Sequence, residues 1–129
     1  MFSPDGRWIA YTSNEGGQPN VYVQPFAGPG AKSQVSRDSG SHPVWRADGR
    51  ELFYLGVDQT MMAVPIGERG SFDAGLPQAL FPARAVLGSN QAYAVTKDGQ
   101  RFLVNARSAP PSSVAPLTVV LNWTVAFQK

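Results

Sequence analysis

The chain has no cysteine and only one histidine among its 129 residues. Without thiols it can form neither a disulfide nor a thiolate metal site, and a histidine-based metal site needs more than one imidazole. We therefore expect no metal, no cofactor and no catalytic cluster built on these residue types. The lack of cysteine fits a reducing or an oxidising compartment equally well, so localisation stays open.

The chain also has only a small excess of charge of one sign. Eleven Lys and Arg against nine Asp and Glu leave a net charge of +2, although the calculated pI is about 9.2. The basic residues are scattered, whereas nucleic acids and membrane surfaces need a concentrated basic face. No stretch approaches the roughly 18 apolar residues of a membrane span, and residues 1–6 do not begin a signal peptide. We expect a soluble protein that binds neither nucleic acid nor membrane.

Glycine and proline, in contrast, are abundant, with 13 and 11 residues. They interrupt every candidate amphipathic helix, so the chain should be nearly all β. Asp-Gly pairs between apolar segments are strong hairpin signals, because glycine tolerates the positive φ of a tight turn. Three such pairs recur about 43 and then about 50 residues apart, a spacing typical of propeller blades. The expected turn residues are Asp5, Gly6, Asp48, Gly49, Asp98 and Gly99.

Each Asp-Gly turn should join two antiparallel strands, and further strands are expected at 21–26, 61–66 and 117–123, with shorter ones at 32–36 and 78–81. Only Met1 and Phe2 precede the first turn, so the first unit lacks most of its innermost strand. The last unit ends after its third strand. We predict a single partial β-propeller of about three antiparallel blades, at about 1–38, 39–82 and 83–129, the first and last incomplete.

The segment Ser3-Pro4-Asp5-Gly6, followed by the strand 7–11, resembles the TolB-like propeller repeat, whose hallmark is Ser-Pro-Asp-Gly. The second copy keeps 43–45 and 48–54 but has Arg46-Ala47 in place of Ser-Pro, and the third keeps Asp98-Gly99. The order of segments is also similar to the C-terminal end of propellers that follow some bacterial serine/threonine kinase domains. This resemblance implies a scaffold for protein or ligand contacts. Kinase activity is not implied, because the chain has no kinase motif.

Few residues are candidates for chemistry. His42 stands at the entrance to an inner strand, where it could line a central channel, yet a lone histidine without nearby partners is more often structural. Glu51 and Asp58 have no evident partner for acid and base catalysis, and no serine lies in a Gly-x-Ser-x-Gly elbow. Met61-Met62 suits packing better than a soft-metal site. The segment 108–116 is either a long blade loop or a proline-rich recognition ligand.

The aromatic residues have two possible roles. They could stack on ligand rings, or they could fill the space between adjacent blades, which we favour because each buries a large apolar area. The residues concerned are Trp8, Trp45, Trp123, Tyr11, Tyr22, Tyr54 and Tyr93.

Three partial blades cannot close a ring, since propellers have four to eight blades. Their uncovered edges and faces favour association with another chain. We therefore predict a non-enzymatic binding and assembly module that forms a homodimer with a six-blade ring, or that packs against the remainder of a larger propeller. The alternatives are a hydrolase-like enzyme with its site in the channel of an assembled ring, and a sensor segment of a kinase-type protein.

Overall fold

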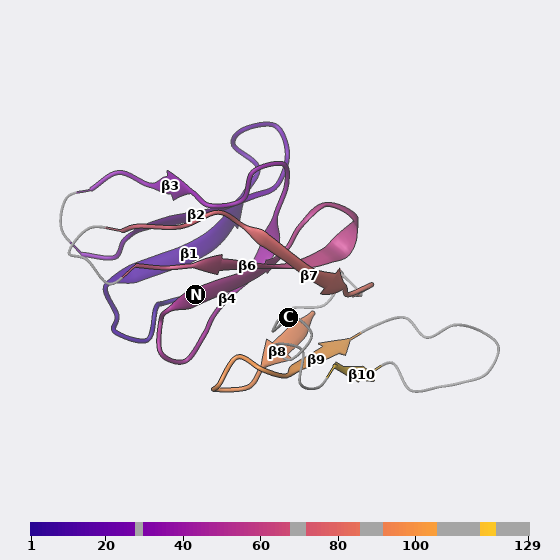
Figure 1. Cartoon of the computed structure of the whole chain (residues 1–129). Helices are drawn as coiled ribbons and strands as arrows, with labels where there is room; N and C mark the ends of the chain where they lie inside the picture. The colour runs from indigo at the N-terminus through magenta and orange to yellow at the C-terminus, as the bar shows by residue number, and fades with distance from the viewer. Residues whose placement is uncertain (28–29, 68–71, 86–91, 106–116, 121–129) are drawn as a thin grey trace.

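The computed structural model describes residues 1–27, 30–67, 72–85 and 92–105, together with the backbone of 117–120. Its strands form three antiparallel sheets, each made of strands consecutive in the chain (Figure 1). The first sheet contains β1 (Trp8–Ser13), β2 (Asn20–Pro25) and β3 (Ser33–Gln34). The second contains β4 (Ser41–Trp45), β5 (Glu51–Leu55), β6 (Thr60–Pro65) and β7 (Gln78–Pro82). The third contains β8 (Tyr93–Val95), β9 (Phe102–Asn105) and β10 (Leu117–Val120).

The expected all-β architecture is confirmed. The described strands number three, four and three per sheet, and the helical structure among the described residues is one 3-10 turn at Val57–Gln59. Two strands differ in length from the expected ones. Only Ser33–Gln34 of the segment 32–36 pairs with β2, whereas β1 continues to Ser13. Residues 121–123 of the last expected strand lie outside the described residues.

All three Asp-Gly turns have the same backbone geometry. The φ angles of Gly6, Gly49 and Gly99 are 75°, 76° and 71°, in the region that a side chain strains. Each glycine N–H donates over 2.9 Å to the carbonyl three residues earlier, on Ser3, Arg46 and Thr96 respectively. The shared geometry defines equivalent positions in the three repeats, which are counted below from the turn aspartate.

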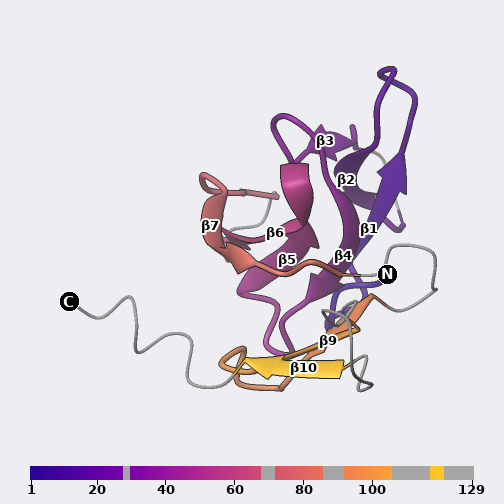
Figure 2. The same cartoon turned by 90° about the vertical axis from the view of Figure 1, so that its right-hand side faces the viewer.

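The core lies between the sheets and forms two seams. At the first seam β1, β2 and Val35 pack against the second sheet, through Ala10, Val21, Val23, Val35, Trp45, Leu52, Tyr54 and Val64. At the second seam the second and third sheets meet, through residues that include Phe53, Leu55, Met61, Ala63, Phe81, Tyr93, Phe102 and Val104. In the turned view of Figure 2 the third sheet lies below β4 and β5.

The second sheet is covered on both faces. Along β5, Leu52 and Tyr54 point to the first seam, and Phe53 and Leu55 point to the second. This explains why β5 is a continuous apolar run, since a strand buried on both faces has no polar side. We call the face that carries the fifth residue after the turn aspartate (Ala10, Phe53 or Leu103) the forward face of its sheet, and the opposite face its backward face. In the first and second sheets the forward face is turned toward the next sheet along the chain.

In the part of the chain that the structure describes, no helix combines the length and apolar character needed to cross a membrane.

Candidate functional site

The three turn aspartates accept hydrogen bonds within their own turns. The Oδ1 atoms of Asp5, Asp48 and Asp98 accept from the backbone N–H two residues on, over 3.1, 2.9 and 3.0 Å. Ser3 and Thr96 each donate a hydroxyl to the aspartate of their own turn over 2.6 Å. These bonds act on the backbone of the hairpin, which is the structural use that Asp commonly has in turns.

The second turn has Arg46 where the other two turns have a hydroxyl residue. Its Nε lies 3.4 Å from Asp48 Oδ2, and its Nη1 donates to Glu51 Oε1 over 2.9 Å. The sequence showed no partner for Glu51 in acid and base catalysis, and the folded hairpin gives this side chain an ion-pair partner, Arg46. Arg46 and Glu51 are separated by the whole turn, so only the folded hairpin brings them together. The pair ties the two strands of the hairpin and leaves Glu51 unsuited to acid and base catalysis.

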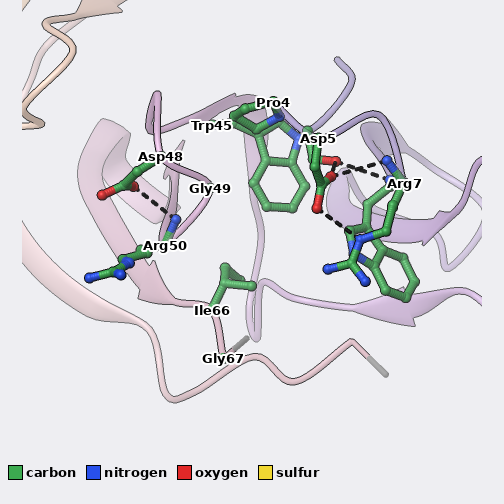
Figure 3. A pocket seen from close by; sticks show the side chains of 11 residues that line it. Pro4, Asp5, Arg7, Trp45, Asp48, Gly49, Arg50, Ile66 and Gly67 are labelled. Atoms are coloured by element: carbon green, nitrogen blue, oxygen red, sulfur yellow. Dashed lines mark hydrogen bonds and ion pairs between the residues drawn. The ribbon is translucent and has the colours of Figure 1, made fainter. Parts of the chain in front are cut away.

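A groove of about 440 Å³ separates the first two turns (Figure 3). The ion pair of Asp5 with Arg7, at 2.8 Å, lies on one side. On the other side lies Asp48, which accepts a hydrogen bond from the backbone N–H of Arg50. Hydrogen bonds from Ser3 and then from Arg7 lower the pKa of Asp5 to about 2, so its carboxylate stays charged near neutral pH. Because Asp5 and Asp48 are both engaged within their turns, the groove has no assigned chemistry.

His42 lies in β4 with φ at +55°, an unusual backbone conformation for a residue with a side chain. Its N–H donates to Thr12 Oγ1 of the first sheet over 3.3 Å, and its carbonyl accepts from Tyr93 Oη of the third sheet over 2.7 Å. The backbone of this residue therefore links all three sheets. Partial burial, which disfavours the charged form, lowers the pKa of its imidazole.

The side chain of His42 also lines a cavity of about 560 Å³ between the innermost strands β4 and β8. Its ring Nδ1 lies 2.9 Å from Ser41 Oγ, within hydrogen-bond distance. The described residues contain no group of three or more His, Asp or Glu side chains that could hold a metal ion. The backbone of His42 therefore holds the three sheets together, and among the described residues no acid, base or nucleophile other than the Ser41 hydroxyl is hydrogen-bonded to its imidazole.

Most of the described aromatic residues pack between the sheets. Trp45, Tyr54 and Tyr93 are 6%, 2% and 3% exposed, and the Trp45 indole N–H donates to the carbonyl of Met1 over 3.1 Å. Burial raises the pKa of Tyr93 well above its usual range and that of Tyr54 to about 12. Trp8 is half-buried against Phe72. Trp123 and the segment 108–116 lie outside the described residues.

The backward face of the first sheet holds a second group of aromatic residues. Phe2 pairs with Ile9 and meets Phe26 edge to face, with ring centroids 4.8 Å apart. On the same face Tyr11 stacks on Tyr22 at 5.9 Å. Phe2 and Phe26 are 51% and 60% exposed, so large apolar area faces solvent here. The sequence predicted uncovered blade faces without naming Phe2 and Phe26 as part of one. Tyr11 and Tyr22 were expected to pack between adjacent blades, and they are in neither seam of the described structure.

The described side chains on the forward face of the third sheet are smaller than these aromatic residues. Ala94 pairs directly with Leu103 across β8 and β9, so the two side chains share this face. Leu103 is 41% exposed, whereas its neighbours Phe102 and Val104 point to the second seam and are each 1% exposed. The two outermost faces of the described structure therefore differ in side-chain size.

No known family profile matches the chain, and no curated protein matches it. Among solved structures it is similar to the crystal structure of TolB from Acinetobacter baumannii, with a TM-score of 0.60 and 18% sequence identity. The match covers 83% of this chain and 26% of the TolB chain, so the chain spans about a quarter of that protein's length. At this identity the match shows the fold, a TolB-like β-propeller arrangement. It does not bear on the resemblance to kinase-linked propellers, which stays a hypothesis.

Proposed function

We propose that this chain is a non-enzymatic binding and assembly module made of propeller blades, in which two copies associate to close a ring. The observation that carries the proposal is the exposure of equivalent positions in the three repeats. The fifth residue after the turn aspartate is Ala10, Phe53 or Leu103. The first two are 0% and 1% exposed at the seams, and Leu103 is 41% exposed.

The backward face of the first sheet gives the same contrast. The residue three positions before the turn aspartate is Phe2 in the first repeat and Trp45 in the second; they are 51% and 6% exposed. Phe26 and Ile66 are also equivalent, because each donates its N–H to the carbonyl of the arginine after its turn glycine, over 2.9 and 2.8 Å. Ile66 packs at the first seam, while Phe26 is 60% exposed.

Phe2, Phe26 and Leu103 are thus large apolar residues, like their equivalents at the seams. No described sheet packs against them. Burying a Phe or Leu side chain contributes about 1.5–3 kcal/mol, so covering both faces is a substantial driving force. A second copy offers the matching faces. Two copies of three blades give six, which is within the range of closed propellers, and the closed ring has the twofold symmetry most common in oligomers.

The test is the mass of the chain in solution. Light scattering at micromolar concentration should give about twice the chain mass of 13.9 kDa. Phe26→Asp should lower the mass to that of one chain, because a carboxylate buried in an apolar interface is strongly unfavourable. Leu76→Asp is the matched control: Leu76 is 70% exposed and lies between β6 and β7, on neither outward face. A monomeric parent chain, or equal effects of the two substitutions, would refute the proposal.

The alternative of an enzyme with its site in the channel has less support. Such a site needs several convergent polar side chains. Around the cavity between β4 and β8, the described lining contains the polar side chains of His42 and Tyr93, and the Tyr93 hydroxyl is already used in its bond to the His42 carbonyl.

A further inference from the structure

We infer that each closing contact joins unlike ends of two copies, with the third sheet of one copy packing its forward face on the backward face of the other copy's first sheet. This inference rests on the proposed function and specifies the partner surface. Like ends could also associate, first sheet on first sheet or third on third. Three features of the molecule distinguish these arrangements.

The first feature is the direction of packing within the chain. At both internal seams the forward face of one sheet meets the backward face of the next. Two faces have no other described sheet against them: the backward face of the first sheet and the forward face of the third. Joining them repeats the arrangement that the chain already uses twice, whereas joining like faces requires a packing mode that the described structure does not contain.

The second feature is side-chain size. At the first seam small residues of the forward face, such as Ala10 and Val21, meet large residues of the backward face, such as Trp45 and Tyr54. The uncovered faces have the same asymmetry. The backward face of the first sheet is aromatic, with Phe2 and Tyr11 at the positions equivalent to Trp45 and Tyr54. The forward face of the third sheet has Ala94 and Leu103. Close packing favours large against small residues.

The third feature is the row of turns. An added Cβ on Gly49 would lie 3.7 Å from Pro4 of the preceding turn, and one on Gly99 would lie 3.0 Å from Arg46 of the preceding turn. Gly6 has no such neighbour, because nothing lies within 4 Å of its added Cβ. In the closed ring, the turn that precedes the Gly6 turn is the one at Thr96–Gly99 of the second copy. Pro4 is equivalent to Lys97 and Arg46 is equivalent to Thr96. The geometry of the first seam therefore places the partner's Lys97 beside Gly6.

Disulfide formation tests this contact in a chain that has no cysteine of its own. Lys97 and Gly6 are both exposed, so cysteines there are open to an oxidant. Single variants Gly6→Cys and Lys97→Cys are prepared, unfolded, mixed, refolded together and oxidised with copper phenanthroline. We expect a covalent two-chain product from the mixture and none from either variant alone. The matched control is Pro4→Cys with Gly49→Cys in one chain, which places cysteines at the equivalent positions of the first seam and should form an intramolecular disulfide.

The outcomes separate the two proposals. A particle of two chains with cross-linking only in the mixture supports the inference. A particle of two chains in which Gly6→Cys or Lys97→Cys cross-links with itself means that like ends meet, which overturns the inference and keeps the assembly. A particle of two chains without any cross-link, while the control pair forms its disulfide, also overturns the inference. A chain that stays monomeric overturns the proposed function, and the inference with it.

Discussion

The second sheet and the two sheets that flank it are built from the same repeat but differ in what covers them. The second sheet is enclosed on both faces, and its residues Leu52, Phe53, Tyr54 and Leu55 are at most 2% exposed. The first and third sheets each have another described sheet packed on one face only. Strand β9, equivalent to β5, accordingly alternates between buried and more exposed positions, as at Phe102 and Leu103. The difference shows that a repeat position acquires its burial from the neighbouring sheet and not from its own residue type.

The sharpest way to test this comparison is to truncate the same repeat position in two sheets. Phe53→Ala should lower the free energy of unfolding by about 3–5 kcal/mol, because it leaves a cavity between the second and third sheets. Phe53 there meets Phe102 edge to face at 5.1 Å. Leu103→Ala should cost less than about 1 kcal/mol in the dissociated chain, since Leu103 is 41% exposed. Urea unfolding at a concentration where the chain is monomeric measures both values.

Similar costs for the two substitutions would mean that the forward face of the third sheet is already packed within one chain. The proposed contact with a second copy would then lose its basis.

A smaller effect is expected at the turns. Gly6→Ala and Gly99→Ala both place a side chain at a φ of 71–75°, which costs on the order of 1 kcal/mol. Gly99→Ala also sets a methyl group 3.0 Å from Arg46 Cδ, whereas Gly6→Ala meets nothing within 4 Å. We therefore expect Gly99→Ala to lower the melting temperature of the monomeric chain more than Gly6→Ala does. Thermal unfolding followed by circular dichroism gives the order, and the reverse order would contradict the packing of the second turn against the third.

The smallest expected effect is the pH dependence of the first turn. The pKa of Asp5 is lowered from 3.8 to about 2 in the folded chain, chiefly by the Ser3 hydroxyl and the backbone N–H of Arg7. A carboxyl group with a depressed folded pKa stabilises the fold above its unfolded pKa, and this contribution is lost as the pH falls from about 4 to about 2. The side chain is half exposed, so the contribution is small.

Asp5→Asn removes this titration and retains an acceptor for the turn. The variant should lose less stability than the parent chain between pH 4 and pH 2, measured by urea unfolding at each pH. Arg7→Gln is a useful companion variant: it removes the ion pair and keeps the Ser3 hydrogen bond, so most of the pH dependence should remain. A parent chain and an Asp5→Asn variant with parallel pH profiles would exclude a contribution from this group.

Much of the fold follows from local sequence signals. An Asp-Gly pair between apolar segments predicts a hairpin wherever it occurs, and strands were expected close to the observed bounds of β2, β6 and β7. The strained backbone of His42 was not predictable, because it depends on bonds to Thr12 and Tyr93 of the two other sheets. The pairing of Arg46 with Glu51 required the folded turn. The candidate assembly surface could be expected only in outline, since sequence spacing does not say which residue of a strand faces outward at the end of an array.

The sequence alone determined the all-β architecture and the positions of its turns, because hairpin turns are local and glycine is the residue that tolerates their positive φ. Tertiary structure decided which of three equivalent positions is buried. Ala10, Phe53 and Leu103 occupy the same place in their repeats, yet only the first two have another described sheet packed over them. Burial depends on neighbours brought together from distant parts of the chain, and that is the property from which the assembly of this protein is inferred.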